Sequence, residues 1–350
     1  MTRRCAVMLH EAFLAHDPGH GHVESPRRLA GLYRALEGSE QRGRFLFPAF
    51  VPADEDLLAL NHSRAHIARV AATAGSPFEC LDPDTYTSPR SYEAACLAAG
   101  AAVSAVDMVL KGEVDNAFAL VRPPGHHAER DHTLGFCLFN NIAVAARHAL
   151  KNHGLERIMV VDWDLHHGNG TQNAFYDTDQ VLFFSTHQYP YFPGSGALQE
   201  TGRGRGEGYT INVPLPGGQD DAAFARIFNE LVVPLAESYR PELIMVSAGF
   251  DTYAGDPLGT MMVSEEGYTY MTGVLTGLAG ELCGGRLVLV LEGGYDLTIM
   301  ERGVLGALGE LAGDRLMNRE RRLQMGNARV PLRALDEARE VAKKYWTIEG

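Results

Sequence analysis

The chain has 350 residues, of which 45% are hydrophobic and 21% are charged, and this balance is typical of a globular protein with a large buried core rather than of a disordered chain. Its formal net charge of -13 argues against a nucleic-acid-binding surface, because proteins that follow phosphates gather Lys and Arg on one face. The same negative charge favours a cationic substrate.

The predicted elements alternate between short apolar runs and longer segments of helical periodicity. Runs typical of strands buried on both faces are 6–9, 117–121, 158–161, 181–184, 210–213, 243–246 and 287–291. Segments long enough for crossover helices are 91–110, 140–153, 220–239 and 264–281. This βαβ alternation predicts a three-layer α/β fold with a parallel sheet. Because no linker rich in Pro, Ser or Gly divides the chain, we expect one domain across residues 1–350.

The cysteines and the apolar stretches indicate the cellular compartment of the protein. The five cysteines are scattered and never form a Cys-x-x-Cys pair, which favours a reducing compartment over a disulfide framework or a thiolate zinc site. The N-terminal apolar run reaches Glu11 too soon for the core of a signal peptide. The longest apolar stretch, 94–110, is rich in Ala and Gly and is interrupted by Asp107. We therefore expect a cytoplasmic protein without a membrane or nucleic-acid partner.

Polar residues with catalytic potential follow four of the predicted strands. They lie just beyond the carboxyl ends of these strands, the edge at which open α/β sheets bind ligands. In chain order they are His126 and His127 after 117–121, Asp162, Asp164, His166 and Asn169 after 158–161, Asp251 after 243–246, and Tyr295 after 287–291. Four loops are therefore expected to converge on one crevice.

Three of these residues form a candidate metal site. Asp164 and His166 are two positions apart, so at the end of a strand their side chains point to the same side, as two ligands of one ion must. Asp162 shares that parity, and Asp251 is the best-placed third ligand from another strand. Two carboxylates and one imidazole leave a position open, which is typical of a catalytic site. Zn²⁺ is the preferred ion, although oxygen-rich sites also take Fe²⁺ or Mn²⁺.

The segments that carry these residues resemble a known family. RPPGHHA, GFCLFNN, VDWDLHHGNGTQ, SAGFDTYAGDPLG and LEGGYD are similar, in content and order, to the signature blocks of the zinc-dependent histone deacetylase superfamily. The superfamily includes bacterial histone-deacetylase-like amidohydrolases, acetoin utilisation proteins and acetylpolyamine amidohydrolases. The resemblance implies the arginase-deacetylase fold, with a single parallel sheet of about eight strands between helical layers. The Gly-Asn-Gly sequence around Asn169 resembles the class II branch.

The resemblance also implies a role for each residue of the crevice. It implies zinc ligands at Asp164, His166 and Asp251. His126 and His127 become tandem catalytic histidines, with Asp162 orienting the first and Asn169 partnering the second. Because a carboxylate raises a histidine's pKa more than a neutral amide does, His127 is expected to be the neutral base that deprotonates water. Tyr295 is expected to donate its hydroxyl to the developing oxyanion.

The substrate channel is predicted in the same way. Gly135, Phe136 and Phe192 resemble the narrow aromatic walls that enclose the methylene groups of an acylated lysine. Leu258 occupies a position at the channel mouth. In one polyamine-selective branch of the superfamily, the matching position resembles a glutamate. Leucine cannot pair with a distal ammonium group, so it favours acetyl-lysine in proteins or peptides over acetylpolyamines.

Further features follow from the resemblance alone. Arg27 resembles an arginine that lines an internal acetate channel, with a plain salt bridge as the alternative. Ser185, together with main-chain groups around Asp162 and His166, matches a structural potassium site near the zinc. Asp84 lies in the loop that grips the substrate backbone in this family, but we leave it out of the predicted site.

The sequence therefore predicts a zinc amidohydrolase acting on acetyl-lysine, with an acetylpolyamine amidohydrolase as the nearest alternative. An arginase-type binuclear hydrolase is disfavoured, because its second ion needs aspartates where Gly168 and Tyr253 stand here. An inactive acetyl-lysine-binding module is also disfavoured, because binding alone does not require tandem histidines and Tyr295. Nothing in the sequence indicates the oligomeric state.

Overall fold

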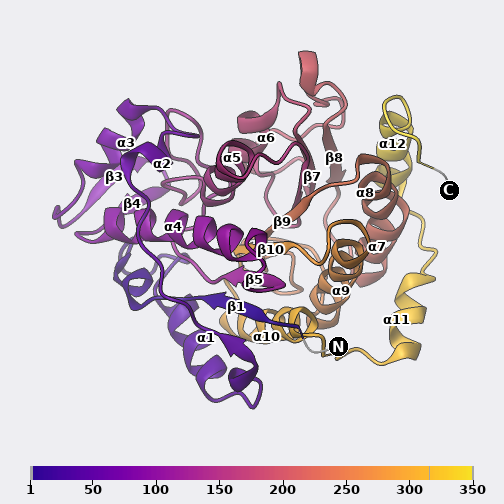
Figure 1. Ribbon diagram of the computed structural model, residues 1–350, viewed down its shortest axis with the longest axis horizontal. Coiled ribbons are helices and arrows are strands. Elements are labelled where there is room, and N and C mark those ends of the chain that lie inside the picture. Colours follow the sequence, from indigo (N-terminus) through magenta and orange to yellow (C-terminus); the bar gives the residue numbers. More distant parts are fainter. Residues whose placement is uncertain (1–2, 315, 349–350) are drawn as a thin grey trace.

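A computed structural model describes residues 3–314 and 316–348, and a parallel β-sheet lies at its centre (Figure 1). The strands of this sheet are β1 (Cys5–Met8), β2 (Phe45–Leu46), β5 (Asn116–Ala119), β6 (Ile158–Asp162), β7 (Val181–Gln188), β8 (Thr210–Leu215), β9 (Leu243–Ala248) and β10 (Leu287–Leu291). Their order is β2-β1-β5-β10-β9-β6-β7-β8, and every neighbouring pair is parallel. The prediction of about eight parallel strands is confirmed.

Helices cover both faces of the sheet. One face carries α4 (Ser91–Leu110), α5 (Asn141–Asn152) and α6 (Asn169–Phe175), with α2 (Glu55–Leu58) and α3 (Arg64–Ala71) beside them. The other face carries α1 (Arg27–Glu37), α7 (Asp221–Ile227), α8 (Val233–Tyr239), α9 (Glu265–Leu282) and α10 (Leu297–Ala312), followed by α11 (Arg319–Gly326) and α12 (Arg333–Ala342). This is the predicted three-layer α/β architecture. The extent of one domain over 1–350 stays a prediction.

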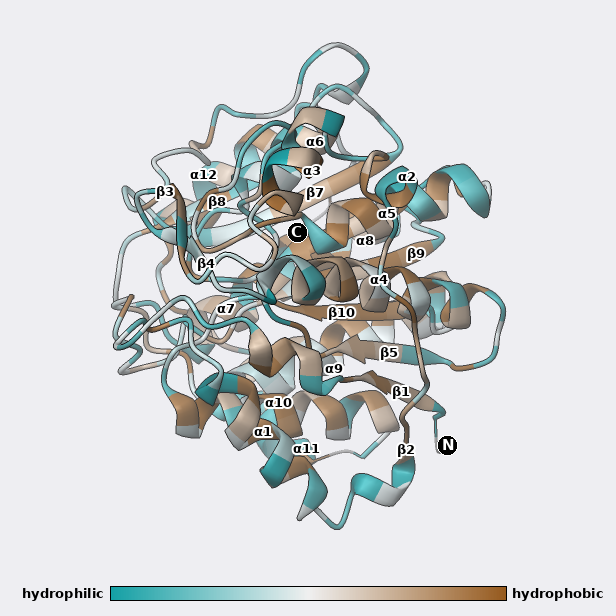
Figure 2. Cartoon of the chain, turned by 90° about the vertical axis from the view of Figure 1, so that its left-hand side faces the viewer, coloured by the Kyte–Doolittle hydropathy of each residue, from teal (hydrophilic) through white to brown (hydrophobic). Residues whose placement is uncertain are grey.

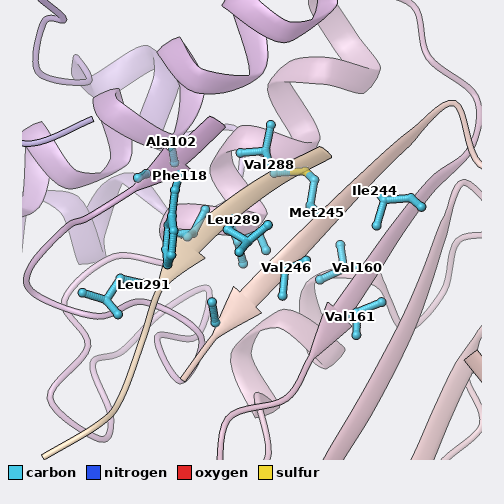
Figure 3. Close-up of a cluster of buried hydrophobic side chains, with 14 of the residues drawn as sticks. Ala102, Phe118, Val160, Val161, Ile244, Met245, Val246, Val288, Leu289 and Leu291 are labelled. Atoms are coloured by element: carbon cyan, nitrogen blue, oxygen red, sulfur yellow. The ribbon is translucent and has the colours of Figure 1, made fainter. Parts of the chain in front are cut away.

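The central strands are apolar because both of their faces are covered. Every residue of β1, β5, β6, β7, β9 and β10 is buried. Figure 3 shows side chains of β6, β9 and β10 packed together, with Phe118 and Ala102 beside them. In Figure 2 strands β9 and β10 are mostly hydrophobic, whereas several outer helices carry hydrophilic segments. A strand buried on both faces reads as a continuous apolar run, which explains why all seven predicted runs are strands.

Three strands were not predicted, and each is short. β2 has two residues at the edge of the sheet, which is too few to show a periodicity. β3 (Glu79–Asp82) and β4 (Thr85–Thr87) form a separate antiparallel pair outside the main sheet. Residues Glu79 and Cys80 of β3 are exposed, so this pair lacks the apolar run that identified the central strands. The pair matters for the site because it places Asp84 beside the cavity described below.

Helix α4 contains the longest apolar stretch of the sequence. Among residues 3–314 and 316–348 it is the one helix long and apolar enough to cross a membrane, but 72% of its apolar window is buried. It packs against β5, β10 and α5. Its composition is therefore that of a core helix, in which the apolar residues contact the sheet.

Candidate active site

The predicted crevice lies at the carboxyl ends of four strands that are neighbours in the middle of the sheet. These strands are β5, β10, β9 and β6, and a loop with catalytic potential follows each of them. The loops surround a cavity of about 250 Å³. Eight predicted site residues line it: His126, His127, Gly135, Phe136, His166, Phe192, Leu258 and Tyr295. Asp84 and Tyr191, which were not among the predicted site residues, line it as well.

Asp164, His166 and Asp251 meet at the floor of this cavity, and all three are buried. The Nδ1 atom of His166 lies 3.3 Å from Oδ1 of Asp164 and 3.2 Å from Oδ2 of Asp251. Two ligands of a tetrahedral Zn²⁺, each ~2.0–2.2 Å from the ion, are about 3.3–3.5 Å apart. The spacing of the three ligand atoms therefore fits one such ion.

Backbone groups hold the two carboxylates and leave one oxygen unused. The N–H of Leu165 donates to Oδ1 of Asp251 at 2.9 Å, and the N–H of Gly293 donates to Oδ2 of Asp164 at 2.8 Å. Within the described part of the chain, Oδ2 of Asp251 is buried and has no hydrogen-bond partner. A buried carboxylate oxygen without a partner is costly, and a bound cation removes that cost. A Cβ atom at Gly293 or Gly249 would overlap these carboxylates, so both backbones approach them as only glycine allows.

The tandem histidines have different partners. Nδ1 of His126 lies 3.0 Å from Oδ2 of Asp162, whereas Nδ1 of His127 lies 2.8 Å from Oδ1 of Asn169. The two rings are adjacent, with centroids 4.0 Å apart. The structure therefore brings together the two pairs that the resemblance implied.

Burial and neighbouring charges separate the pKa values of the two histidines. Burial acts to lower the pKa of His126, but the negative charges of Asp164 and Asp162 outweigh it and hold this pKa well above its usual value. Burial, followed by the positive charges of His126 and His166, holds the pKa of His127 well below its usual value. The surroundings thus favour the imidazolium form of His126 and the neutral form of His127.

Glu129 was not predicted from the sequence and orients one of these partners. Its Oε1 atom accepts a hydrogen bond of 2.6 Å from Nδ2 of Asn169. Because the amide nitrogen of Asn169 is engaged there, its oxygen faces His127 and accepts from Nδ1–H. Nε2 of His127 is then the unprotonated nitrogen. Glu129 directly follows the GHHA segment, but no local pattern shows that it meets a residue 40 positions away.

Glu292 is a second residue whose role the sequence did not show. It is fully buried, and its Oε2 atom accepts from the backbone N–H groups of Gly125 at 2.7 Å and His126 at 3.1 Å. Its Oε1 atom accepts from the hydroxyl of Ser247 at 3.0 Å. Burial raises the pKa of Glu292 to about 7. Glu292 therefore joins the ends of β9 and β10 to the loop that carries the histidines.

Tyr295 is positioned by contacts to its backbone and its ring. Oδ2 of Asp256 accepts from the N–H groups of Tyr295 at 2.7 Å and Asp296 at 3.1 Å. The guanidinium of Arg28 lies 5.0 Å from the centroid of the Tyr295 ring and donates to the carbonyl of Gly294 at 2.7 Å. The Gly-Gly-Tyr loop is thus held from both sides.

The structure places the neighbouring residues Arg27 and Arg28 in different surroundings. Arg27 is exposed, whereas Arg28 is buried behind Tyr295. The Glu24 carboxylate accepts a hydrogen bond from Arg28 at 3.1 Å and two from Arg122 at 2.5 and 2.8 Å. Two adjacent arginines look alike in a sequence, and only the start of α1 at Arg27 decides which of them points inward.

Aromatic rings form the walls of the cavity. The Phe192 ring lies 5.2 Å from the His127 ring, and the Phe136 ring lies 5.9 Å from the Tyr295 ring, both measured between centroids. Phe136 has a φ of 69°, a strained value for a residue with a side chain. A Cβ atom at Gly135 would overlap His127, so this turn approaches the histidine closely.

Three residues form the mouth of the cavity. Leu258 is half-buried there, and its carbonyl accepts a hydrogen bond of 2.9 Å from the hydroxyl of Tyr191. Oδ1 of Asp84, which also lines the cavity, accepts from the N–H of Gly135 at 3.2 Å. Burial and the nearby Asp82 raise the pKa of Asp84 to about 6. The mouth thus combines one apolar and one acidic side chain.

Residues 22–311 match the histone deacetylase domain family. This chain belongs to that family. It is 41% identical to a "Histone deacetylase-like amidohydrolase" of Pseudomonas aeruginosa, over 90% of this chain and 88% of the relative. It is 42% identical to the "Polyamine deacetylase HDAC10" of Mus musculus, over 88% of this chain but 48% of that protein. The crystal structure of the HDA15 HD domain superposes with a TM-score of 0.89 and 35% identity, covering 99% of this chain and 96% of the other.

Family membership and the buried triad together define the general chemistry. The chain is a metal-dependent amidohydrolase of the histone deacetylase family. The fold predicted from the resemblance is confirmed by the match to a solved histone deacetylase domain.

Proposed function

We propose that this protein is a cytoplasmic zinc deacetylase that hydrolyses acetyl-lysine side chains of proteins or peptides to a free amine and acetate. The observation that carries the proposal is the aromatic cavity, which ends at the triad of Asp164, His166 and Asp251. Phe136 and Phe192 supply apolar surface for the lysine methylenes, and the acetyl group reaches the floor.

Asp164, His166 and Asp251 are the residues that hold the ion in this proposal. A bound Zn²⁺ supplies a Lewis acid that polarises the amide carbonyl and lowers the pKa of water to about 7. Fe²⁺ suits the same ligands, because two of the three are carboxylates. Oδ2 of Asp251, which is buried without a hydrogen-bond partner among the described residues, supports this assignment.

The side chains above the triad move the protons. His127 is neutral, so its Nε2 atom takes a proton from the attacking water as the water oxygen bonds to the carbonyl carbon. The same proton passes to the amine nitrogen as the carbon–nitrogen bond breaks and acetate forms. The charges of Asp164 and Asp162 raise the pKa of His126, and its imidazolium form stabilises the negative charge.

Tyr295 completes the site from the opposite side. Burial raises the pKa of Tyr295 well above its usual value, so the hydroxyl keeps its proton. A protonated phenol can donate to the carbonyl oxygen as negative charge develops there. Its backbone is held by Asp256, which limits the movement of the ring.

The second candidate function is hydrolysis of acetylpolyamines, favoured by the similarity to a protein named a polyamine deacetylase. The deciding feature is the half-buried Leu258 at the mouth, which cannot pair with a distal ammonium group. We expect acetyl-lysine peptides to give a higher kcat/KM than acetylspermidine or acetylputrescine with one zinc-reconstituted preparation. A higher value for either polyamine overturns the substrate proposal and leaves the metal assignment standing.

A structural potassium ion near the zinc is a further part of the proposal. Asp162 and Ser185 are register partners on the neighbouring strands β6 and β7, and both are fully buried. Oδ1 of Asp162 accepts from the N–H of Asp164 at 3.1 Å. A potassium ion held here stiffens the loop that carries two zinc ligands. Replacing potassium with a large organic cation in the assay buffer should therefore lower the thermal midpoint.

A further inference from the structure

A second group of metal-ligand side chains lies outside the active site, where α4 and α5 pack on each other. It consists of Asp107 near the end of α4, His148 in the last turns of α5, and His153 directly after α5. α4 precedes β5 and α5 precedes β6, so these helix ends lie at the edge where the strands begin. The catalytic triad lies at the opposite edge of the sheet, beyond the carboxyl ends of β6 and β9.

The three side chains converge on one point. Nε2 of His148 and Nε2 of His153 each lie 2.7 Å from the same atom, Oδ1 of Asp107. One ligand atom from each residue lies within 4.8 Å of the other two. The imidazole rings have centroids 5.5 Å apart and are inclined by 64°, so their nitrogens approach the carboxylate from different directions. Two imidazoles and one carboxylate with an open side match the ligand set of an exchangeable transition-metal site.

We propose that Asp107, His148 and His153 bind a divalent transition-metal ion, with Zn²⁺ as the natural occupant, and thereby link α4 to α5. The ligand atoms must separate from 2.7 Å to about 3.3 Å to accept the ion. Their side chains are 12–28% exposed, so small rotations achieve this, and water reaches the remaining positions of the ion.

The neighbouring groups are compatible with an ion. Asn152 contacts Nδ1 of His148 at 2.9 Å. When Nε2 binds a metal, Nδ1 carries the proton, and a half-turn of the Asn152 amide presents its oxygen as the acceptor. Lys111 pairs with the other oxygen of Asp107 at 3.1 Å, but its side chain is 53% exposed and free to turn into solvent.

The competing explanation is a metal-free hydrogen-bonded cluster, in which both imidazoles donate to Asp107. Burial acts to raise the pKa of Asp107, but hydrogen bonds from His153, His148 and Lys111 outweigh it and lower this pKa to about 2. The carboxylate is therefore ionised with or without an ion. Only direct measurement of bound metal separates the two explanations.

The test is the zinc content of the full-length protein after equilibration with micromolar free zinc and gel filtration. We expect about two equivalents per chain in the wild type and about one in His148→Gln, His153→Gln and Asp107→Ala. His132→Gln, which changes an exposed histidine outside the cluster, is the matched control and should keep two. Each of these variants should keep the wild-type kcat/KM in zinc-sufficient buffer, which shows that it is folded.

A second measurement determines metal binding at the cluster in a variant that lacks a ligand of the catalytic ion. Asp251→Ala should still bind one equivalent of Co²⁺, with visible absorption that is lost in Asp251→Ala/His153→Gln. Zinc added beyond one equivalent should also raise the thermal midpoint of the wild type but not that of His153→Gln. A single zinc per wild-type chain, or unchanged stoichiometry in the His148 and His153 variants, overturns the proposal. Neither outcome depends on the substrate of the enzyme.

Discussion

Two groups of histidine and aspartate lie at opposite edges of one sheet, and they differ in how their ligand atoms are held. In the catalytic triad, backbone N–H groups of Leu165 and Gly293 hold the carboxylates from behind, and all three side chains are buried. In the peripheral cluster, which consists of Asp107, His148 and His153, Oδ1 of Asp107 already accepts from both imidazoles. These side chains are partly exposed.

Residue type alone therefore does not make a reaction centre. The triad has backbone N–H support, a cavity with aromatic walls above it and an oxygen of Asp251 with no hydrogen-bond partner among residues 3–314 and 316–348. The peripheral cluster satisfies its own hydrogen bonds and has no comparable enclosure in the described structure. We therefore expect the triad to hold its ion more tightly and to carry the chemistry, and the cluster to act on stability alone.

Removing one ligand from each group tests most directly whether the two groups differ in function. Asp251→Ala or Asp164→Ala should lose the catalytic ion and reduce turnover to the background of uncatalysed hydrolysis, because each change removes a third of the protein ligands. Asp107→Ala should leave kcat/KM unchanged. Comparable losses of activity in Asp107→Ala and Asp251→Ala would show that the two groups are not functionally distinct.

The next effect concerns the oxyanion donor above the triad. Tyr295→Phe should keep the fold and the metal content but lower kcat by about two to three orders of magnitude, as for other lost oxyanion donors. Steady-state kinetics with a parallel metal determination checks both parts. An unchanged kcat means that the Tyr295 hydroxyl does not contact the reacting carbonyl.

A smaller contrast is expected between the two histidines. His127→Ala should lower kcat by about two to four orders of magnitude, the usual contribution of a general base, whereas His126→Ala should cost less. The reason is that burial and the charges of His126 and His166 lower the pKa of His127, while the charges of Asp164 and Asp162 raise that of His126. Single-turnover rates at neutral pH compare the variants, and the reverse order shows that the two roles are exchanged.

The smallest effect concerns substrate choice at the mouth. Leu258→Glu should shift the ratio of kcat/KM toward acetylspermidine by on the order of fivefold, equivalent to about 1 kcal/mol for a partly exposed ion pair. Leu258→Gln has nearly the same shape without the charge and is the control. An equal shift in both variants would show that side-chain shape, rather than charge, sets the preference.

Local patterns were sufficient for much of the fold and the site. The seven apolar runs were identified because strands covered on both faces lack polar positions. Asp164, His166 and Asp251 could be predicted because parallel strands bring their carboxyl ends to one edge. The roles of the tandem histidines and Tyr295 came from the family resemblance, and the structure places these residues around the same cavity.

The remaining features depend on contacts between distant segments. Glu292 supports the histidine loop from 166 positions away, and the peripheral cluster joins residues separated by 41 and 46 positions. Arg28 rather than Arg27 lies behind Tyr295 because of where α1 begins, which adjacent identical residues cannot indicate. Asp84 reaches the cavity through the β3–β4 pair, whose strands carry no clear apolar pattern.

Zinc titration of a chelator-stripped protein tests the central claim most directly. The His153→Gln variant is the best choice, because its remaining site is the triad of Asp164, His166 and Asp251. Turnover of an acetyl-lysine peptide should be absent after chelation and should rise linearly to a plateau at one equivalent of zinc. Full turnover by the metal-free protein, or turnover that zinc and iron both fail to restore in the folded chain, would contradict the account.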